Sequence, residues 1–313
     1  MIQFGWMGRA LSLVIGSVFA VTVSAQSAAP AAPATAAAPA AKAPAAKAPA
    51  KSAKPAKRPA EPAFKMVLEP KAMDLLKTMS DRLAKAKSMS FTATVGYEYP
   101  SRLGPPIVYT MRYDVTMQRP DKLKILMPGD GPASEFYYDG KAMMAYAPAE
   151  NLVAVSAAPP TVEEALKFAY NSAALYFPFV DLLVDDPYAA LTDGAILAFY
   201  IGPSSVVAGT KTDMLAWANK DVFLQIWIGA DDKLPRRVRA VFAADPQQLR
   251  HELDLSNWKL DAAVTPDTFT SEKAQAAPRI AFKSPTTLPP GMKPLVKMTP
   301  AKPAPAKPQP KTP

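Results

Sequence analysis

The clearest pattern in the chain lies in residues 107–118, where apolar and polar side chains alternate. The odd positions are apolar, and the even positions, apart from Val108, are polar. Successive side chains of a β-strand point to opposite faces, so this stretch predicts a long strand with one apolar face and one polar face. A strand of this kind is typical of an antiparallel sheet that is covered on one side only.

The same one-sided alternation returns along much of the chain. It predicts further strands at 89–99, 122–127, 133–138, 141–146, 151–155, 195–201, 204–218, 221–229, 235–243 and 247–259. Asp139-Gly140 is a strong hairpin signal between two of them. The pattern therefore indicates a sheet of about ten strands.

Helical patterns occur at the start and in the middle of this region. Residues 69–87 carry apolar residues three and four positions apart, which predicts an amphipathic helix. Thr161 and Glu164 form the sequence signature of a capping box before a second helix. Residues 177–184 are very apolar and predict a short helix or loop, and Asp186 precedes a further short turn of helix. We interpret residues 161–190 as a lid or plug and predict an α+β fold: a strongly curved antiparallel sheet, or unclosed β-barrel, around these helices.

Composition separates this domain from the rest of the chain. Residues 1–25 resemble a secretory signal peptide, with an apolar run and the small-x-small sequence Val23-Ser24-Ala25. Residues 26–63 are almost entirely Ala, Pro and Lys, and residues 283–313 are rich in Pro and Lys, so both predict disordered segments. The domain is expected at 64–282 and is mildly acidic, because the surplus of basic residues lies in the flanking segments. That distribution disfavours nucleic-acid binding.

The residues offer little for catalysis. The chain has no cysteine, which excludes disulfides, thiolate metal sites and a lipid-modified cysteine. His251 is the single histidine, and we favour a structural role for it over a polar contact inside a ligand cavity. Nucleophile elbows, P-loops and dinucleotide fingerprints are absent from the sequence, and the paired acids fit turn and cap positions. We therefore expect no enzyme activity, no metal and no cofactor.

The predicted inner face of the sheet is rich in Tyr, Phe and Met. Most of these side chains are expected to form the core under the helix at 69–87. A sheet this long nevertheless presents more apolar surface than one helix and a short insert cover, which favours a cavity for an acyl chain. The candidate lining residues are Phe91, Tyr97, Tyr109, Met111, Tyr113, Met117, Phe136, Met143, Phe179, Leu182 and Leu183.

The last third of the domain carries short motifs in a familiar order. Leu234-Pro235-Arg236-Arg237 opens a strand, Leu253 to Trp258 follow in the next one, and Pro266 and Phe269 close the domain. This order resembles the periplasmic lipoprotein-carrier (LolA-like) superfamily, and the closer likeness is to an uncharacterised family of predicted periplasmic proteins within it. The resemblance covers about residues 68–282. It implies an unclosed β-barrel that holds helices in its concave side, with an apolar cavity for acyl chains.

Two functions follow as hypotheses for a periplasmic protein. One is a non-enzymatic binder or carrier of an apolar ligand, such as a lipid or a lipoprotein acyl chain. The other is an envelope scaffold or partner-docking protein, held to anionic surfaces by its basic flanking segments.

Overall fold

The computed structural model describes residues 66–129 and 132–284 of the chain. The helices are α2 (Pro70–Lys85), α3 (Val162–Ala173), α4 (Pro187–Thr192) and α5 (Glu272–Ala276), with short 3₁₀ turns η2 (Val180–Leu182) and η3 (Pro266–Phe269). The strands are β1 (Ser88–Tyr99), β2 (Ile107–Gln118), β3 (Lys122–Met127), β4 (Ser134–Tyr138), β5 (Ala142–Ala147), β6 (Leu152–Ala157), β7 (Leu197–Ser204), β8 (Thr212–Ala218), β9 (Val222–Gly229), β10 (Pro235–Phe242), β11 (Arg250–Leu260) and β12 (Arg279–Ile280).

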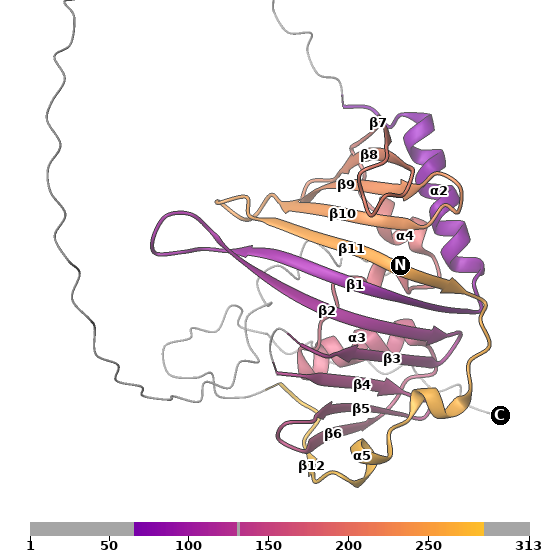
Figure 1. Cartoon of the computed structure of the whole chain (residues 1–313), viewed down its shortest axis with the longest axis vertical. Coiled ribbons are helices and arrows are strands. Elements are labelled where there is room, and N and C mark those ends of the chain that lie inside the picture. The colour runs from indigo at the N-terminus through magenta and orange to yellow at the C-terminus, as the bar shows by residue number, and fades with distance from the viewer. Residues whose placement is uncertain (1–65, 130–131, 285–313) are drawn as a thin grey trace, which may run out of the picture. The chain divides into compact units, whose positions relative to one another are not determined.

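All twelve strands belong to one sheet, in the order β12-β6-β5-β4-β3-β2-β1-β11-β10-β9-β8-β7. Neighbouring strands are antiparallel, except that the short β12 runs parallel to β6. The two edges of the sheet are β12 and β7, which do not pair with each other, so the sheet is unclosed. Figure 1 shows its curvature. The predicted α+β class and the unclosed barrel are confirmed.

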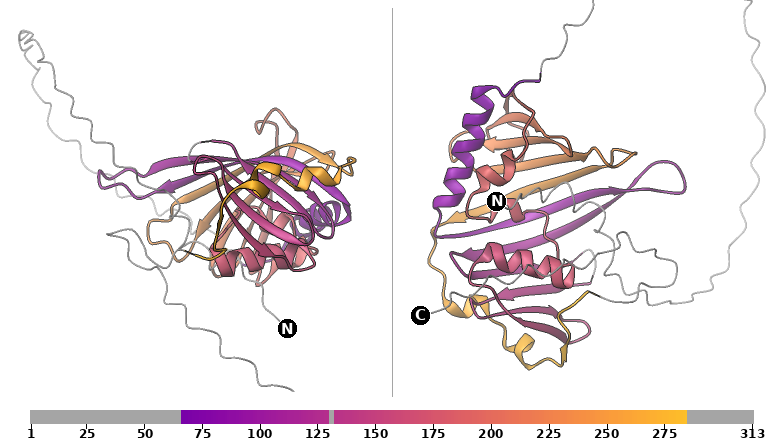
Figure 2. Two further views of the ribbon diagram at one scale, coloured as in Figure 1. Left: turned by 90° about the horizontal axis from the view of Figure 1, so that it is seen from below. Right: turned by 180° about the vertical axis from the view of Figure 1, so that it is seen from behind.

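The three longest helices, α2, α3 and α4, lie on the concave face of this sheet. In the right-hand view of Figure 2, α2, α3 and α4 lie together in front of the strands, with the sheet curving around them. The predicted stripe of α2 is buried against the sheet, with Leu76, Met79 and Leu83 each at most 1% exposed. Pro70 fits the first turn of α2, where its missing N–H would have no helical partner. Burial of one helical stripe therefore positions α2 across the edge of the sheet at β7.

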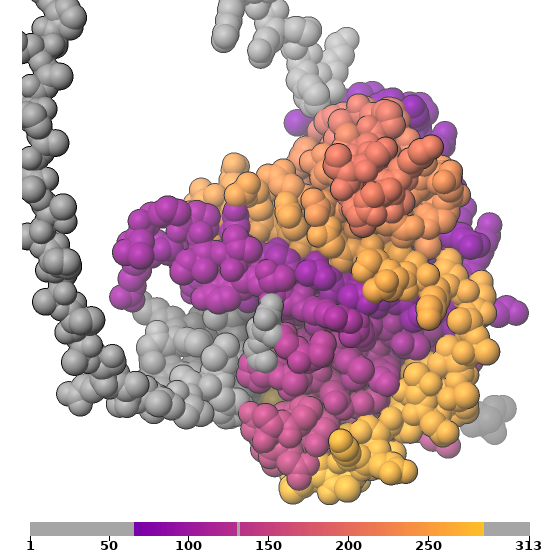
Figure 3. Space-filling model, viewed as in Figure 1, coloured from indigo at the N-terminus to yellow at the C-terminus, as the bar shows by residue number. Residues whose placement is uncertain are grey.

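The central hairpin β1–β2 is paired along its whole length, from Ser88 opposite Gln118 to Tyr99 opposite Ile107. Its inner face is buried only over half of that length. Tyr113, Val115 and Met117 are buried, whereas Ile107 and Tyr109 are about half exposed. The alternation was thus predicted correctly, but the strands continue past the helices that cover them. Figure 3 shows this outer half of the hairpin projecting from the surface.

Three details differ from the sequence predictions. The strand expected at 204–218 is shorter and forms only β8 from Thr212, because residues 205–211 form the turn between β7 and β8, in which Ala208 and Gly209 have positive φ. The sheet has twelve strands rather than about ten. The C-terminal part adds η3, α5 and β12, which were not predicted. α5 covers a small apolar cluster on the convex face, and the buried members of that cluster are Tyr137, Met144, Tyr146, Val153, Ala274 and Ala277.

The predicted signal peptide and Ala/Pro/Lys segment, and nearly all of the C-terminal segment, lie outside the described residues. Within the described ranges, no helix combines the length and the apolar character that crossing a bilayer requires.

Truncation of the α2 stripe tests the packing. Leu83→Ala should lower the free energy of unfolding by about 2–5 kcal/mol, because the fully buried side chain leaves a cavity under α2. The matched control is Leu103→Ala, since Leu103 is 90% exposed and its loss should change stability by less than about 0.5 kcal/mol. Urea unfolding of both variants provides the measurement, and equal losses would contradict the assigned core.

Candidate functional site

The structure divides the eleven predicted cavity residues into two groups. Eight are buried in one continuous core: Phe91, Tyr113, Met117, Phe136, Met143, Phe179, Leu182 and Leu183. The other three, Tyr97, Tyr109 and Met111, lie on the outer half of the β1–β2 hairpin and are partly or largely exposed. The predicted set is therefore buried where residues 177–183 pack on the strands and is open to solvent at the outer half of the hairpin.

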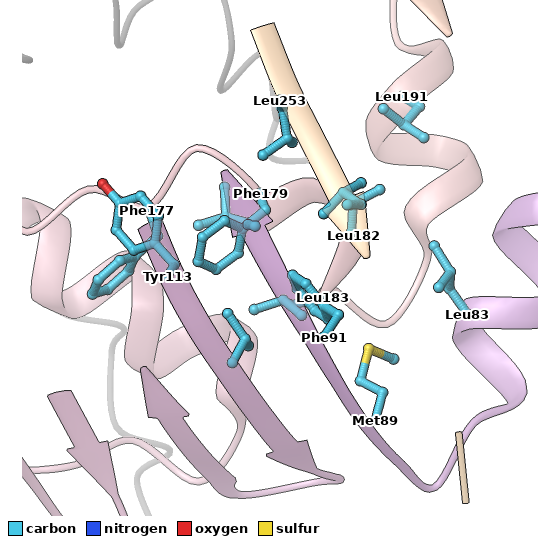
Figure 4. Close-up of a cluster of buried hydrophobic side chains, with 14 of the residues drawn as sticks. Leu83, Met89, Phe91, Tyr113, Phe177, Phe179, Leu182, Leu183, Leu191 and Leu253 are labelled. Atoms are coloured by element: carbon cyan, nitrogen blue, oxygen red, sulfur yellow. The ribbon is translucent and has the colours of Figure 1, made fainter. Parts of the chain in front are cut away.

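The buried group is brought together by residues 177–183, which we call the plug segment. Figure 4 shows its side chains pointing into the concave face, toward β1 and β2. The ring of Phe179 packs edge-on against Phe91, with centroids 5.6 Å apart, and against Tyr113 at 5.3 Å. Phe177 lies 5.5 Å from Phe136. The plug segment thus covers the aromatic side chains on the concave face of β1, β2 and β4.

A bulge in β11 completes the wall around Phe91. Asn257 has a positive φ, and the pairing of β1 with β11 shifts register between Ser90 and Thr92. The ring of Trp258 consequently lies against Phe91, with centroids 4.4 Å apart. The Trp258 indole N–H donates to the Pro235 carbonyl at 3.0 Å, which satisfies the polar atom of a half-buried ring.

Arg119 holds the C-terminal end of the plug segment. The residue lies at the turn between β2 and β3, and its guanidinium donates to the carboxylate of Asp185 at 2.8 Å and to the Val184 carbonyl at 2.9 Å. Glu163 of α3 accepts from the backbone N–H of Asp185 at 3.3 Å. Burial lowers the pKa of Arg119, whereas Asp185 and Glu163 raise it. A charged cluster at one end of the sheet therefore ties the plug segment to the barrel wall.

Sequence reasoning did not find this arginine. The strands predicted at 107–118 and 122–127 left residues 119–121 as a break between them, and that much is correct. The contact spans 66 positions in the chain, so no local spacing could reveal it. The two flanking caps, by contrast, were predicted: Thr161 accepts from the Glu164 N–H, and Asp186 accepts from the Ala189 N–H.

The plug segment also carries a buried carboxyl group. Asp181 is only 8% exposed, and burial raises its pKa to about 7. A carboxyl in such surroundings is favoured in its neutral form, because an apolar environment disfavours the charge. The stability of the packed plug segment is therefore coupled to pH.

His251 lies at the open end of the concave face. Its ring stacks beside Tyr97, with centroids 6.3 Å apart, and meets Phe242 edge-on at 5.3 Å. Burial lowers the pKa of His251, which favours the neutral ring. These ring contacts fit the structural role favoured from the sequence.

Another concave feature lies at the opposite end of the sheet, beside Arg119. It is an open pocket of about 820 Å³ lined by residues 84–88, 118–119 and 261–264. Lys85, Lys87, Arg119 and Asp261 are among its lining residues, so it differs from the aromatic concave face between the sheet and the plug segment. Among the residues that the structure describes, no group of three or more His, Asp or Glu side chains is placed to hold a metal ion.

Removal of the tie should loosen the plug segment. Arg119→Ala should speed hydrogen exchange at the backbone amides of Val180, Leu182 and Leu183 by on the order of tenfold, since a charge-assisted contact is lost. Arg112→Ala is the matched control, because Arg112 pairs with Asp114 on the outer face. Unchanged exchange in Arg119→Ala would show that the tie does not hold the plug segment.

Asp181 gives a signed pH dependence. The folded chain keeps the proton up to about pH 7, whereas the unfolded chain loses it near the ordinary value of 3.8. The contribution of this group to stability is thus fully present below pH 3.8 and is lost as the pH rises to about 7. Asp181→Asn does not titrate, so across this window it should gain stability relative to the wild-type protein, by up to about 4 kcal/mol. Urea unfolding on both sides of the window measures this gain, and a difference that stays constant with pH would contradict it.

Comparison with known proteins identifies the family of the chain. No curated protein matches it. Among solved structures, LprF from Mycobacterium bovis is 17% identical, with 63% of this chain and 96% of LprF covered and a TM-score of 0.40. A LolA superfamily protein from Nitrosomonas europaea is 13% identical, with 64% and 98% covered and a TM-score of 0.27. The MucA/MucB complex from Pseudomonas aeruginosa gives 17% identity, 64% and 61% coverage and a TM-score of 0.37. The model of a family described as "Predicted periplasmic protein (DUF2092)" matches residues 72–283, so the chain belongs to this family and is a periplasmic protein, as the sequence predicted.

Proposed function

We propose that the protein is a non-enzymatic binder or carrier of an apolar ligand in the cell envelope, with an acyl chain of a lipid or lipoprotein as the guest. The observation that supports this proposal is the way the concave face is covered. A short segment of the chain itself, tied at one end by Arg119, lies on an inner face rich in Phe, Tyr and Met.

The exchange of the plug segment for a guest is energetically feasible. An acyl chain gains about 0.8 kcal/mol for each methylene that it buries. It would replace the contacts of Phe177 and Phe179 with contacts of the same apolar kind, so the strands lose little by the exchange. The cost is the loss of the tie to Arg119 and the exposure of the plug side chains.

The open end of the inner face provides a way in. Met111 and Tyr97 are partly buried and continue the line of Tyr113 and Val95 toward solvent. A guest that enters there meets apolar and aromatic side chains throughout, and flexible Met side chains adapt to guests of different shape. These residues lie next to the plug segment, because the OH of Tyr113 contacts the Met111 sulfur at 3.7 Å while its ring packs on Phe179.

A catalytic reading has less support. His251 is packed between aromatic rings, with Tyr97 stacked beside it and Phe242 edge-on to it. Asp181, the carboxyl with the strongest shift toward neutrality, lies inside the core rather than in an open cleft. A general acid or base must lie within hydrogen-bond reach of its substrate, which the burial of Asp181 opposes.

Lipid occupancy tests the proposal directly. The full mature chain, purified from an envelope extract without detergent, should carry an adduct of lipid or fatty-acid mass in native mass spectrometry. Arg119→Ala should raise the occupied fraction, because a loosened plug segment competes less well with the guest. Arg112→Ala should leave that fraction unchanged.

The contradicting result is the absence of bound lipid. In that case the wild-type chain, Arg119→Ala and Arg112→Ala would all be free of adducts, and none would take up a fluorescent fatty acid added to the purified protein. If Arg112→Ala raised the occupied fraction as much as Arg119→Ala does, that result would also contradict the role given to the plug segment.

A further inference from the structure

The outer half of the β1–β2 hairpin carries the most exposed apolar side chains of the central strands. We define this part, residues 99–109, as the arm. Leu103 at its turn is 90% exposed, Val108 is 60% exposed, and Ile107 and Tyr109 are 49% and 47% exposed. The carrier function proposed above needs Tyr97, Met111 and the plug segment, but it does not account for Leu103 or Val108.

We propose that the arm inserts into the surface of an anionic phospholipid bilayer. The first argument is the distribution of its apolar side chains. Ile107 and Tyr109 point to one face of the strand, Val108 points to the other, and Leu103 lies at the tip. A protein partner docked on one face would leave the other face in water, whereas a bilayer surrounds the tip on all sides.

The second argument concerns the backbone of the arm. Membrane burial strips water from backbone N–H groups, and each unsatisfied group is costly. Pro100, Pro105 and Pro106 have no N–H to satisfy. Within the turn, the N–H of Leu103 donates to the Ser101 hydroxyl at 3.0 Å, and the strands remain paired up to Tyr99 and Ile107. The tip therefore exposes few free donors for its length.

The third argument is charge. Residues 99–113 contain Arg102 and Arg112 and no acidic residue. The nearest carboxylates on the hairpin are already paired, Glu98 with Arg250 and Asp114 with Arg112. Arg102 is exposed beside the apolar tip, where its guanidinium can bind headgroup phosphates. The tyrosines at the base of the arm are Tyr97, Tyr99 and Tyr109. Aromatic side chains with a polar tip favour the membrane interface.

The C-terminal end of the described chain lies at the same end of the sheet. α3 begins near the far end, where the Val162 N–H donates to Pro120, and runs along the strands toward the arm (Figure 1). The Ser284 N–H donates to the Ser172 carbonyl near the end of α3. The sequence that follows Ser284 contains no acidic residue and has these lysines: Lys293, Lys297, Lys302, Lys307 and Lys311. An anionic surface reached by the arm would therefore also attract this segment.

The experiment uses the absence of cysteine from the chain. Leu103→Cys in the full mature chain is labelled with a polarity-sensitive nitrobenzoxadiazole dye and mixed with phosphatidylethanolamine/phosphatidylglycerol vesicles. The emission should rise several-fold and shift to the blue. Val206→Cys is the matched control, because Val206 is 85% exposed in the turn between β7 and β8, and its label should not respond.

A second pair of variants tests the apolar contribution. Leu103→Glu should weaken vesicle co-sedimentation about tenfold, because the apolar side chain that would enter the bilayer is replaced by a charged one. The fold should be unaffected, since Leu103 is exposed and takes no part in core packing. Val206→Glu should co-sediment as the wild-type protein does.

Two results would overturn the inference. In the first, the chain co-sediments with vesicles but the emission of the label at position 103 does not change, which assigns binding to the lysine-rich segments alone. In the second, the emission changes only after an envelope protein is added. These results are independent of lipid occupancy in the concave face, so the arm and the proposed carrier function can fail separately.

Discussion

The fold depends on how the concave apolar face of one curved sheet is covered. An antiparallel sheet with one apolar side is stable in water only when another layer shields that side. Here α2 covers the part of the sheet near β7, and residues 177–183 cover the part formed by β1 and β2. The second cover is short and largely without regular structure, so its side chains rather than its backbone provide the shield.

This division explains why the residues that pack the core are also those that the proposed ligand would contact. Phe91 and Tyr113 need an apolar neighbour, and Phe179 supplies it. A cover made of an irregular segment is cheaper to displace than a helix or strand, because fewer backbone hydrogen bonds are lost with it. Arg119 and Asp181 then adjust the balance in opposite ways: the first fastens the segment, and the second becomes costly to bury once it is charged.

The local pattern of the sequence predicted the elements better than their contacts. The bounds of β2 and β3 were predicted without error, and Thr161 caps α3 as expected, because alternation and capping are properties of neighbouring residues. The turn at 205–211 was missed, since its apolar residues continue the pattern of a strand. The tie from Arg119 and the burial of Asp181 depend on segments that only the folded chain brings together.

The candidate site shows the same limit. Eight of the eleven candidate residues lie together in the core. Alternation alone could indicate the five on strands, which are Phe91, Tyr113, Met117, Phe136 and Met143. The interpretation of residues 161–190 as a lid or plug predicted only in general terms that residues 177–183 pack against these strands. The outer part of the hairpin, with Tyr109 exposed, shows that a strand can keep its pattern where no layer covers it.

The most direct test of this account is hydrogen exchange at the amides of residues 180–183, measured in the full chain with and without a bound fatty acid. Displacement of the segment by the guest predicts faster exchange at Val180, Leu182 and Leu183 in the complex. Exchange at these amides that stays unchanged while the fatty acid is bound would place the guest elsewhere and contradict the account.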